Sequence, residues 1–148
     1  MTMELFTIGF AADHAGFRLK DELIGYLAGK GYAIKDYGTY STESCDSPDF
    51  GHPLAEGILK GECRYGISVC HSANGISMTL NRHKGVRAAI CCTGEMAKLA
   101  RNHNDANACS LPAMYLDLEK AAEIMEIFLC EPFEGGRHQR RIDKIDNF

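Results

Sequence analysis

Short apolar runs alternate with helix-like patterns along most of this 148-residue chain. The apolar runs predict five strands, at residues 5–10, 32–36, 65–70, 86–91 and 108–111. Between and after them, apolar periodicity, capping residues and composition predict helices at residues 17–28, 75–81, 94–101, 118–129 and 137–145. Strands interleaved with helices form parallel sheets that are covered on both faces. We therefore expect an α/β protein with a three-layer, Rossmann-like fold around a five-stranded parallel sheet.

One more helix, between about residues 48 and 61, contains a proline at an awkward position. Pro53 has no backbone N–H, so beyond the first turn it removes a helical hydrogen bond. We therefore expect this helix to begin late, with Pro53 in its first turn.

The bulk composition narrows the class of protein. Hydrophobic residues make up 45% of the chain and charged residues 24%, which indicates one globular domain over residues 1–148. A formal net charge of -4 does not suggest a nucleic-acid-binding surface. No apolar run approaches the roughly 20 residues that span a bilayer, and the N-terminus has no signal-peptide pattern. We expect a cytoplasmic protein without a membrane partner.

Seven cysteines are present, an odd number, and none forms a C-x-x-C pair. This pattern favours reduced thiols and argues against a zinc ribbon or a thioredoxin-like redox site. Most of the cysteines are expected to be small buried hydrophobic residues.

Polar residues follow the first and third predicted strands, where parallel sheets bind ligands. Asp13 and His14 precede a helix N-terminus, which favours anions, although Asp13 can equally be a helix cap. The segment Cys70–Gly75 places a thiol before a loop whose amides can converge on an anion. A thiolate base beside an oxyanion hole suits proton transfer next to a carbonyl; the alternative is a buried cysteine and an ordinary turn.

Two further segments carry polar side chains that can bind or react. His103, Asn104 and Asp105 precede the fifth strand and suit proton transfer and hydroxyl binding, or merely form a polar turn. Arg137 and Arg141 are four residues apart, so on a helix they share a face and can clamp a phosphate. The alternative for these arginines is a solvated basic tail.

The motifs DHAGF, the cysteine loop, HNDAN and FEGGRHQRR occur in this order over nearly the whole chain. In this respect the chain resembles type B ribose-5-phosphate isomerases and the related galactose-6-phosphate isomerase subunits. The resemblance implies that Cys70 moves a proton between the first two sugar carbons and that His103 opens the sugar ring. The substrate-binding residues that it implies are Asp13, His14, His71, Ser72, Ala73, Asn74, Gly75, Asn104, Arg137 and Arg141.

The resemblance also implies an isomerase without metal or cofactor, assembled as a homodimer or homotetramer with active sites shared between subunits. The substrate would be ribose 5-phosphate or a related sugar phosphate. The alternative is a regulatory protein that binds a sugar phosphate without turning it over. A flavodoxin-like receiver or cofactor module is a weaker alternative, because the chain has neither an acidic pair at a strand end nor a G-x-G-x-x-G motif.

The chain departs from the family pattern at the expected pocket. The cysteine loop usually reads C-G-[ST]-G-x-G, but His71 and Ala73 replace two of its glycines. Any positive φ is costly at either position. Met114 stands where an arginine is frequent, and Asp46-Ser47-Pro48 stands where the family has D-Y-P. We expect these changes to affect which sugar phosphate is used.

Overall fold

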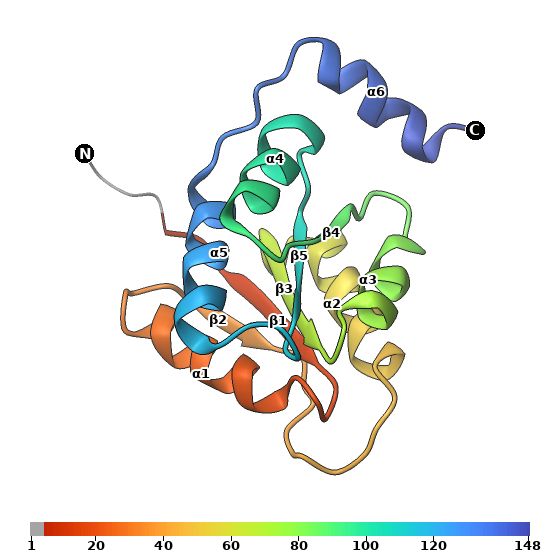
Figure 1. Cartoon of the computed structure of the whole chain (residues 1–148). Coiled ribbons are helices and arrows are strands. Elements are labelled where there is room, and N and C mark those ends of the chain that lie inside the picture. Colours follow the sequence, from red (N-terminus) through yellow and green to blue (C-terminus); the bar gives the residue numbers. More distant parts are fainter. Residues whose placement is uncertain (1–4) are drawn as a thin grey trace.

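A computed structural model describes residues 5–148 and contains one five-stranded parallel sheet (Figure 1). The strand order across the sheet is β2-β1-β3-β5-β4. The strands are β1 (Ile8–Ala12), β2 (Ile34–Asp36), β3 (Tyr65–Cys70), β4 (Ala88–Ile90) and β5 (Ala108–Pro112). The helices are α1 (Phe17–Ala28), α2 (Pro48–Lys60), α3 (Asn74–Asn81), α4 (Gly94–Asn104), α5 (Leu118–Cys130) and α6 (Arg137–Asp146).

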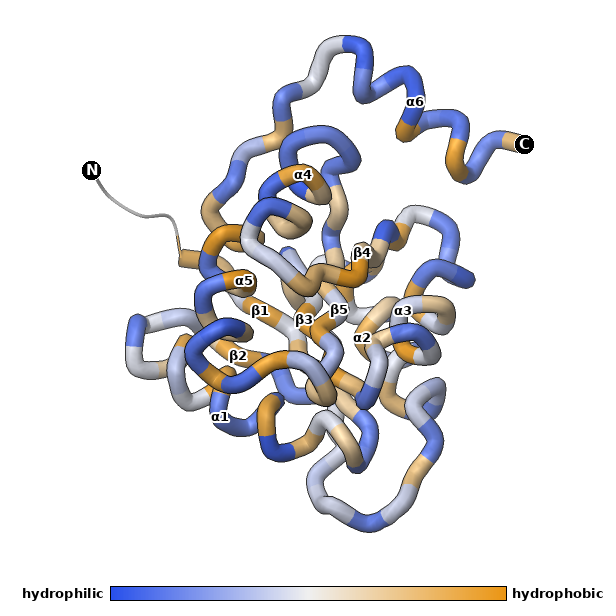
Figure 2. Tube along the Cα trace, in the orientation of Figure 1, coloured by the Kyte–Doolittle hydropathy of each residue, from blue (hydrophilic) through white to orange (hydrophobic). Residues whose placement is uncertain are grey.

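Helices cover both faces of the sheet, which confirms the three-layer α/β fold. Helices α1, α4 and α5 lie on one face, and α2 and α3 lie on the other (Figure 1). Helix α6 packs against α4 and extends away from the sheet. Figure 2 shows apolar residues along the strands and a mostly polar α6. Within residues 5–148, no helix is both long and apolar enough to span a membrane.

The two faces of the sheet differ in side-chain size. Large residues such as Phe10, Ile67 and Leu111 face α1 and α5. Small residues face α2, and a Cβ added at Gly9 or Gly66 would come within 2.7 or 3.1 Å of Leu54 Cδ1. These glycines allow α2 to pack close to β1 and β3.

Strand boundaries differ from the sequence prediction because pairing sets where a strand begins. The first strand starts at Ile8 rather than Leu5, and it continues to Ala12 opposite β3. The second starts at Ile34, because the Tyr32 N–H donates to Leu27 O in the turn that closes α1. The fourth is only Ala88–Ile90, and the fifth extends one residue further than predicted.

The prediction of a late start for α2 is wrong. The helix begins at Pro48, a favourable first position for proline, and runs through Pro53. Because Pro53 has no backbone N–H, one helical hydrogen bond to a carbonyl of the first turn is missing. Burial of Leu54 and Ala55, both 0% exposed, continues on the following turn and outweighs that loss.

A buried ion pair fixes α1 to β2. Lys20 is 0% exposed, and its Nζ donates to both carboxylate oxygens of Asp36 at 2.7 Å. Asp21 Oδ1 lies further from the ammonium, at 3.5 Å. Asp36 also accepts from the Gly38 N–H, so this carboxylate orders the chain directly after β2.

Asp36→Asn is expected to lower the free energy of unfolding by about 3 kcal/mol, because the Lys20 ammonium stays buried without its main counter-ion. Lys20→Met should cost less, since it removes the buried charge itself. Urea unfolding measures both. The control is Glu62→Gln, which breaks the exposed pair with Lys35 and should cost less than about 1 kcal/mol. Equal losses for Asp36→Asn and Glu62→Gln would contradict the assignment.

Candidate functional site

Asp13 and Cys70 meet at the carboxyl edge of the sheet because β1 and β3 are neighbours. Ala12 is in register with Val69, and the Asp13 N–H donates to Val69 O at 3.3 Å. Cys70 is the last residue of β3 and is 5% exposed. Asp13 Oδ1 accepts from the Gly16 N–H at 3.0 Å, so this carboxylate closes the turn before α1, whose N-cap is Gly16 rather than Asp13.

The loop after Cys70 leads directly into the N-terminus of α3. Ser72 Oγ accepts from the backbone N–H and from Nδ2 of Asn74, at 3.3 and 3.2 Å. Ala73 is fully buried and has φ 69° and ψ -7°, the left-handed conformation that L-residues avoid. Ala73, which replaces a glycine of the family pattern, therefore has the costly positive φ considered above. The first amides of α3 have no helical carbonyl to bind and favour an anion.

The turn after β5 forms a second wall beside this loop. The Ala113 N–H donates to Cys70 O at 2.9 Å, and the Met114 N–H donates to His71 O at 3.0 Å. Met114 is 59% exposed. Residue 114, where the family pattern named above has an arginine, therefore lies against the cysteine loop and carries a thioether in place of a guanidinium.

His14 is held by the loop that follows β2. Its Nδ1 accepts from the Cys45 N–H at 3.2 Å, and Cys45 Sγ lies 3.8 Å away. An imidazole that accepts at Nδ1 is neutral and carries its proton on Nε2. Nδ1 of His14 is therefore engaged by the loop before α2, and a ligand of His14 would bind at Nε2.

The sequence prediction missed two residues in the segment before α2. Cys45 holds His14, and Ser47 Oγ would lie 3.4 Å from a Cβ placed at Gly75. The altered D-S-P motif indicated that this segment belongs to the expected pocket. The contact between segments so far apart in the chain could not be read from it.

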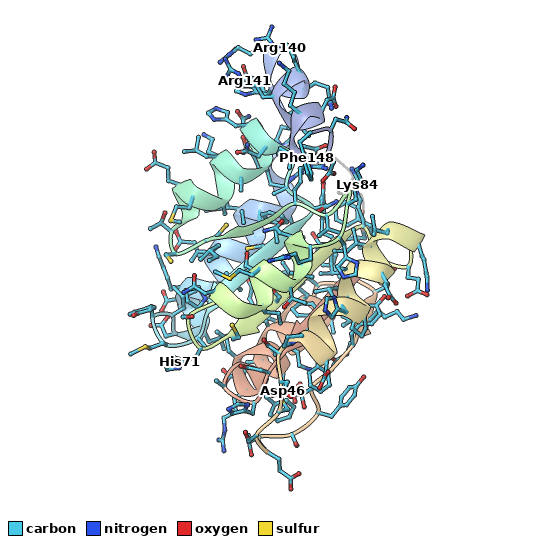
Figure 3. All side chains as sticks on the ribbon, turned by 90° about the vertical axis from the view of Figure 1, so that its right-hand side faces the viewer. Asp46, His71, Lys84, Arg140, Arg141 and Phe148 are labelled. Atoms are coloured by element: carbon cyan, nitrogen blue, oxygen red, sulfur yellow. The ribbon has the colours of Figure 1, made fainter. Side chains whose placement is uncertain are left out.

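The remaining predicted residues lie at the other end of the molecule. His103 and Asn104 belong to the last turn of α4, which ends three residues beyond the predicted end at residue 101. Asp105 ends the helix with φ 47°. Because α4 leads back to the start of β5, its C-terminus lies at the amino edge of the sheet. Figure 3 shows Arg141 of α6 far from His71.

The structure therefore forms two groups rather than one site. The first group combines Asp13 and His14 with the Cys70–Gly75 loop. The second combines His103 and Asn104 with the arginines of α6. Arg137 is 59% exposed in its side chain and pairs with Glu134 at 3.5 Å. Arg141 is exposed as well, so neither guanidinium is enclosed by its own protomer.

All seven cysteines are free, and two of the buried ones are poor candidates for chemistry. Burial raises the pKa of the Cys63 thiol. The hydrogen bond with Cys91, together with burial, raises the pKa of Cys109 well above its ordinary value. A thiol whose pKa is raised is a weak source of thiolate.

The strain at Ala73 predicts an unusual response to glycine. Ala73→Gly should change the free energy of unfolding by less than about 1 kcal/mol, because relief of the left-handed conformation offsets the lost methyl group. Ala97, buried within α4, is the matched control, and Ala97→Gly should cost about 2 kcal/mol. Thermal or urea unfolding measures both variants. Equal losses in the free energy of unfolding would show that Ala73 is unstrained.

Comparisons with known proteins bear on the family and the fold of this chain. A family model described as Ribose/Galactose Isomerase matches residues 8–145. Ribose-5-phosphate isomerase B of Escherichia coli is 38% identical over 138 residues, which cover 93% of each chain. A crystal structure of a ribose 5-phosphate isomerase from Thermotoga maritima superposes with a TM-score of 0.96 at 46% identity, covering 98% of this chain and 100% of that one.

A structure of ribose-5-phosphate isomerase B from Mycoplasma genitalium, with bound ribulose-5-phosphate, has a TM-score of 0.90 and 37% identity. It covers 97% of this chain and 95% of its own. The matches run through both groups of site residues and the sheet that carries them. The chain therefore belongs to the ribose/galactose isomerase family.

Proposed function

We propose that this protein interconverts an aldose phosphate and a ketose phosphate through an enediolate, with Cys70 as the base. Family membership supports sugar-phosphate isomerisation. The observation that carries the cysteine mechanism is the position of Cys70. Its thiol ends the central strand β3 and is followed within four residues by the N-terminus of α3. This arrangement puts a proton acceptor beside amides that favour a developing negative charge.

In the proposed reaction, Cys70 removes the proton from C2 of the open-chain aldose phosphate. The electron pair forms the C1–C2 double bond, and the carbonyl oxygen on C1 becomes the enediolate oxygen. Amides of residues 71–75 stabilise that oxygen, and Asp13 and the Nε2–H of His14 bind hydroxyl or phosphate oxygens. Cys70 then returns the proton to C1, while the proton of the C2 hydroxyl moves to the C1 oxygen and the C2 carbonyl forms, which gives the ketose phosphate.

We assign His103, Asn104, Arg137 and Arg141 to the active site of a neighbouring protomer. Within one protomer these residues lie at the opposite end from Cys70, so a complete site requires a second copy. An apolar groove of about 540 Å³ runs along the edge strand β4 and offers a surface for that copy. Met96, Leu99 and Ile145 line it, each at least 41% exposed. In the shared site, His103 opens the sugar ring and the arginines bind phosphate.

Ribose 5-phosphate and ribulose 5-phosphate are the first substrates to test, because the Mycoplasma genitalium relative has ribulose-5-phosphate bound. His71 lies in the cysteine loop, Met114 bonds to it from the turn after β5, and both differ from the family pattern. We assign the choice of sugar to this pair. A panel of four- to six-carbon aldose and ketose phosphates therefore belongs in the assay.

Cys70→Ser is expected to bind substrate with similar affinity and to lose about 10²–10⁴ in kcat, since a hydroxyl is a poor base near neutrality. A coupled assay with EDTA measures turnover and tests independence from metal. In deuterium oxide, the wild type should exchange the C2 proton of the aldose, and the variant should not. Cys63→Ser, at another buried cysteine, is the control and should keep its turnover. A Cys70→Ser variant with wild-type kcat would move the base elsewhere, with Asp13 the next residue to test.

Mixed dimers test the shared site. Cys70→Ser and His103→Gln homodimers should each be nearly inactive. A mixed dimer, purified with two different tags, should regain about half of the wild-type activity, because one of its two symmetric sites carries neither substitution. A mixed dimer as inactive as its parents would place Cys70 and His103 in the site of a single protomer.

A further inference from the structure

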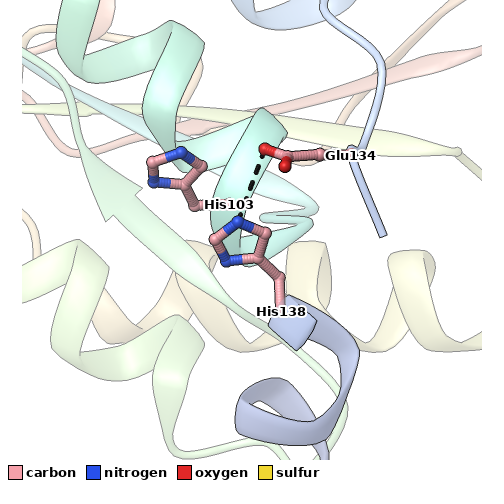
Figure 4. Close-up of side chains that lie close together, drawn as sticks. All are labelled: His103, Glu134 and His138. Carbon is pink, nitrogen blue, oxygen red and sulfur yellow. Dashed lines mark ion pairs between the residues drawn. The ribbon is translucent and has the colours of Figure 1, made fainter. Parts of the chain in front are cut away.

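The ring of His103 stacks on the ring of His138, which comes from the first turn of α6 (Figure 4). The ring centroids are 4.5 Å apart, and the planes differ by 12°. His138 is 6% exposed, whereas His103 is only half-buried. The buried ring therefore forms a flat support on which the more accessible ring rests.

Glu134 faces the edge of the supporting ring. His138 Nε2 lies 3.4 Å from Glu134 Oε2, an ion pair when the ring is protonated. Within residues 5–148, this nitrogen has no hydrogen-bond partner. The second oxygen of Glu134 lies 3.5 Å from Arg137. One carboxylate thus contacts both the supporting histidine and an arginine of the proposed phosphate site.

The segment between α5 and α6 is itself tied to α4 next to His103. The Glu134 N–H donates to Asn102 O at 3.0 Å. Asn102 Nδ2 donates to Glu131 Oε1 at 3.2 Å. These bonds anchor Glu134 to the residue that precedes His103. The stack is therefore built on two elements that are fixed to each other.

We propose that His138 is a positioning residue that fixes the plane of the His103 imidazole, with Glu134 holding His138 in place. The proposal rests on the proposed function, in which His103 acts on the sugar ring. A half-buried histidine can otherwise rotate about its side-chain torsions. Because effective proton transfer needs aligned groups, holding the ring in one orientation raises the rate of the step.

The same three side chains also carry donor atoms within 4.8 Å of one another, and two imidazoles with a carboxylate are zinc ligands. An imidazole binds a metal in the plane of its ring, so two rings that share an ion tilt toward it. The stacked, nearly parallel planes favour ring-on-ring contact instead. The tests below are therefore made with and without EDTA, and a change of the His103 signal on adding EDTA would overturn the stacking proposal in favour of a metal.

Three variants distinguish the effect of the stacked ring from the effects of its nitrogens and of the Glu134 charge. His138→Leu removes the flat ring, His138→Phe keeps a flat ring without nitrogens, and Glu134→Gln removes the charge. Gln139→Leu, at an exposed neighbouring position of α6, is the matched control. His103→Gln identifies the His103 signal in spectra of protein with ¹³C-labelled histidine rings.

The first readout does not depend on activity. In His138→Leu the His103 ring signal should lose its ring-current shift and show averaging between orientations, whereas in His138→Phe and Gln139→Leu it should stay ordered. An unchanged His103 signal in His138→Leu would overturn the proposal. This outcome would leave the proposed function standing.

The second readout is the split between kcat and KM. His138→Leu should lower kcat by about 10- to 100-fold. The kcat of Glu134→Gln should lie between those of the wild type and His138→Leu, and His138→Phe should keep most of the wild-type rate. KM and inhibition by inorganic phosphate should change less than about threefold, because the arginines remain. If His138→Leu instead raised KM and weakened phosphate inhibition at constant kcat, His138 would only anchor α6. If His138→Leu lost the order of the His103 ring but the wild-type protein turned over no sugar phosphate, the proposed function alone would be refuted.

Discussion

The parallel register between β1 and β3 is the constraint on which the first half of the site depends. Each residue of β1 pairs with a residue of the central strand, and β1 ends one residue before β3, so Asp13 comes level with Cys70. Asp13 and Cys70 are therefore neighbours even though 56 residues separate them in the chain. Ala113 then bonds to Cys70 from the other side, through the strand β5 that borders β3. Three loops meet at one point because three strands stop there.

Local chemistry allowed much of this fold to be predicted from sequence. Helix α1 has the predicted bounds, and the side chains of Thr93 and Asp117 cap α4 and α5 directly before the predicted starts of these helices. Strand ends were less well predicted. A strand begins where it can pair with its neighbour in the sheet, and the apolar pattern of one segment carries no information about that neighbour. Pro53 was misjudged for a similar reason, since the burial that sustains α2 through it comes from the sheet.

The site was predicted in part for the same physical reasons. Residues that follow parallel strands share an edge, so the loop of Cys70 and the turn of Asp13 were correctly expected together. Residues that precede a strand lie at the opposite edge. His103 precedes β5, so the same rule indicates that it lies away from Cys70. The stack of His103 on His138 had no signal in sequence, because a mostly polar helix such as α6 does not specify where it packs.

The glycines that bring α2 against the sheet have a consequence for tolerance to mutation. A Cβ at Gly57 would lie 2.0 Å from the hydroxyl oxygen of Tyr37, and one at Gly66 would lie 2.8 Å from Ile58 Cδ1. A larger residue at either position must move Tyr37, Ile58 or α2 itself, and the first turn of α2 follows Ser47 beside the cysteine loop. Loss of activity can therefore originate on the far side of the helix, at positions that touch no reacting atom. In a mutational scan, larger residues at these glycines would therefore lower activity without contacting the proposed active-site loop.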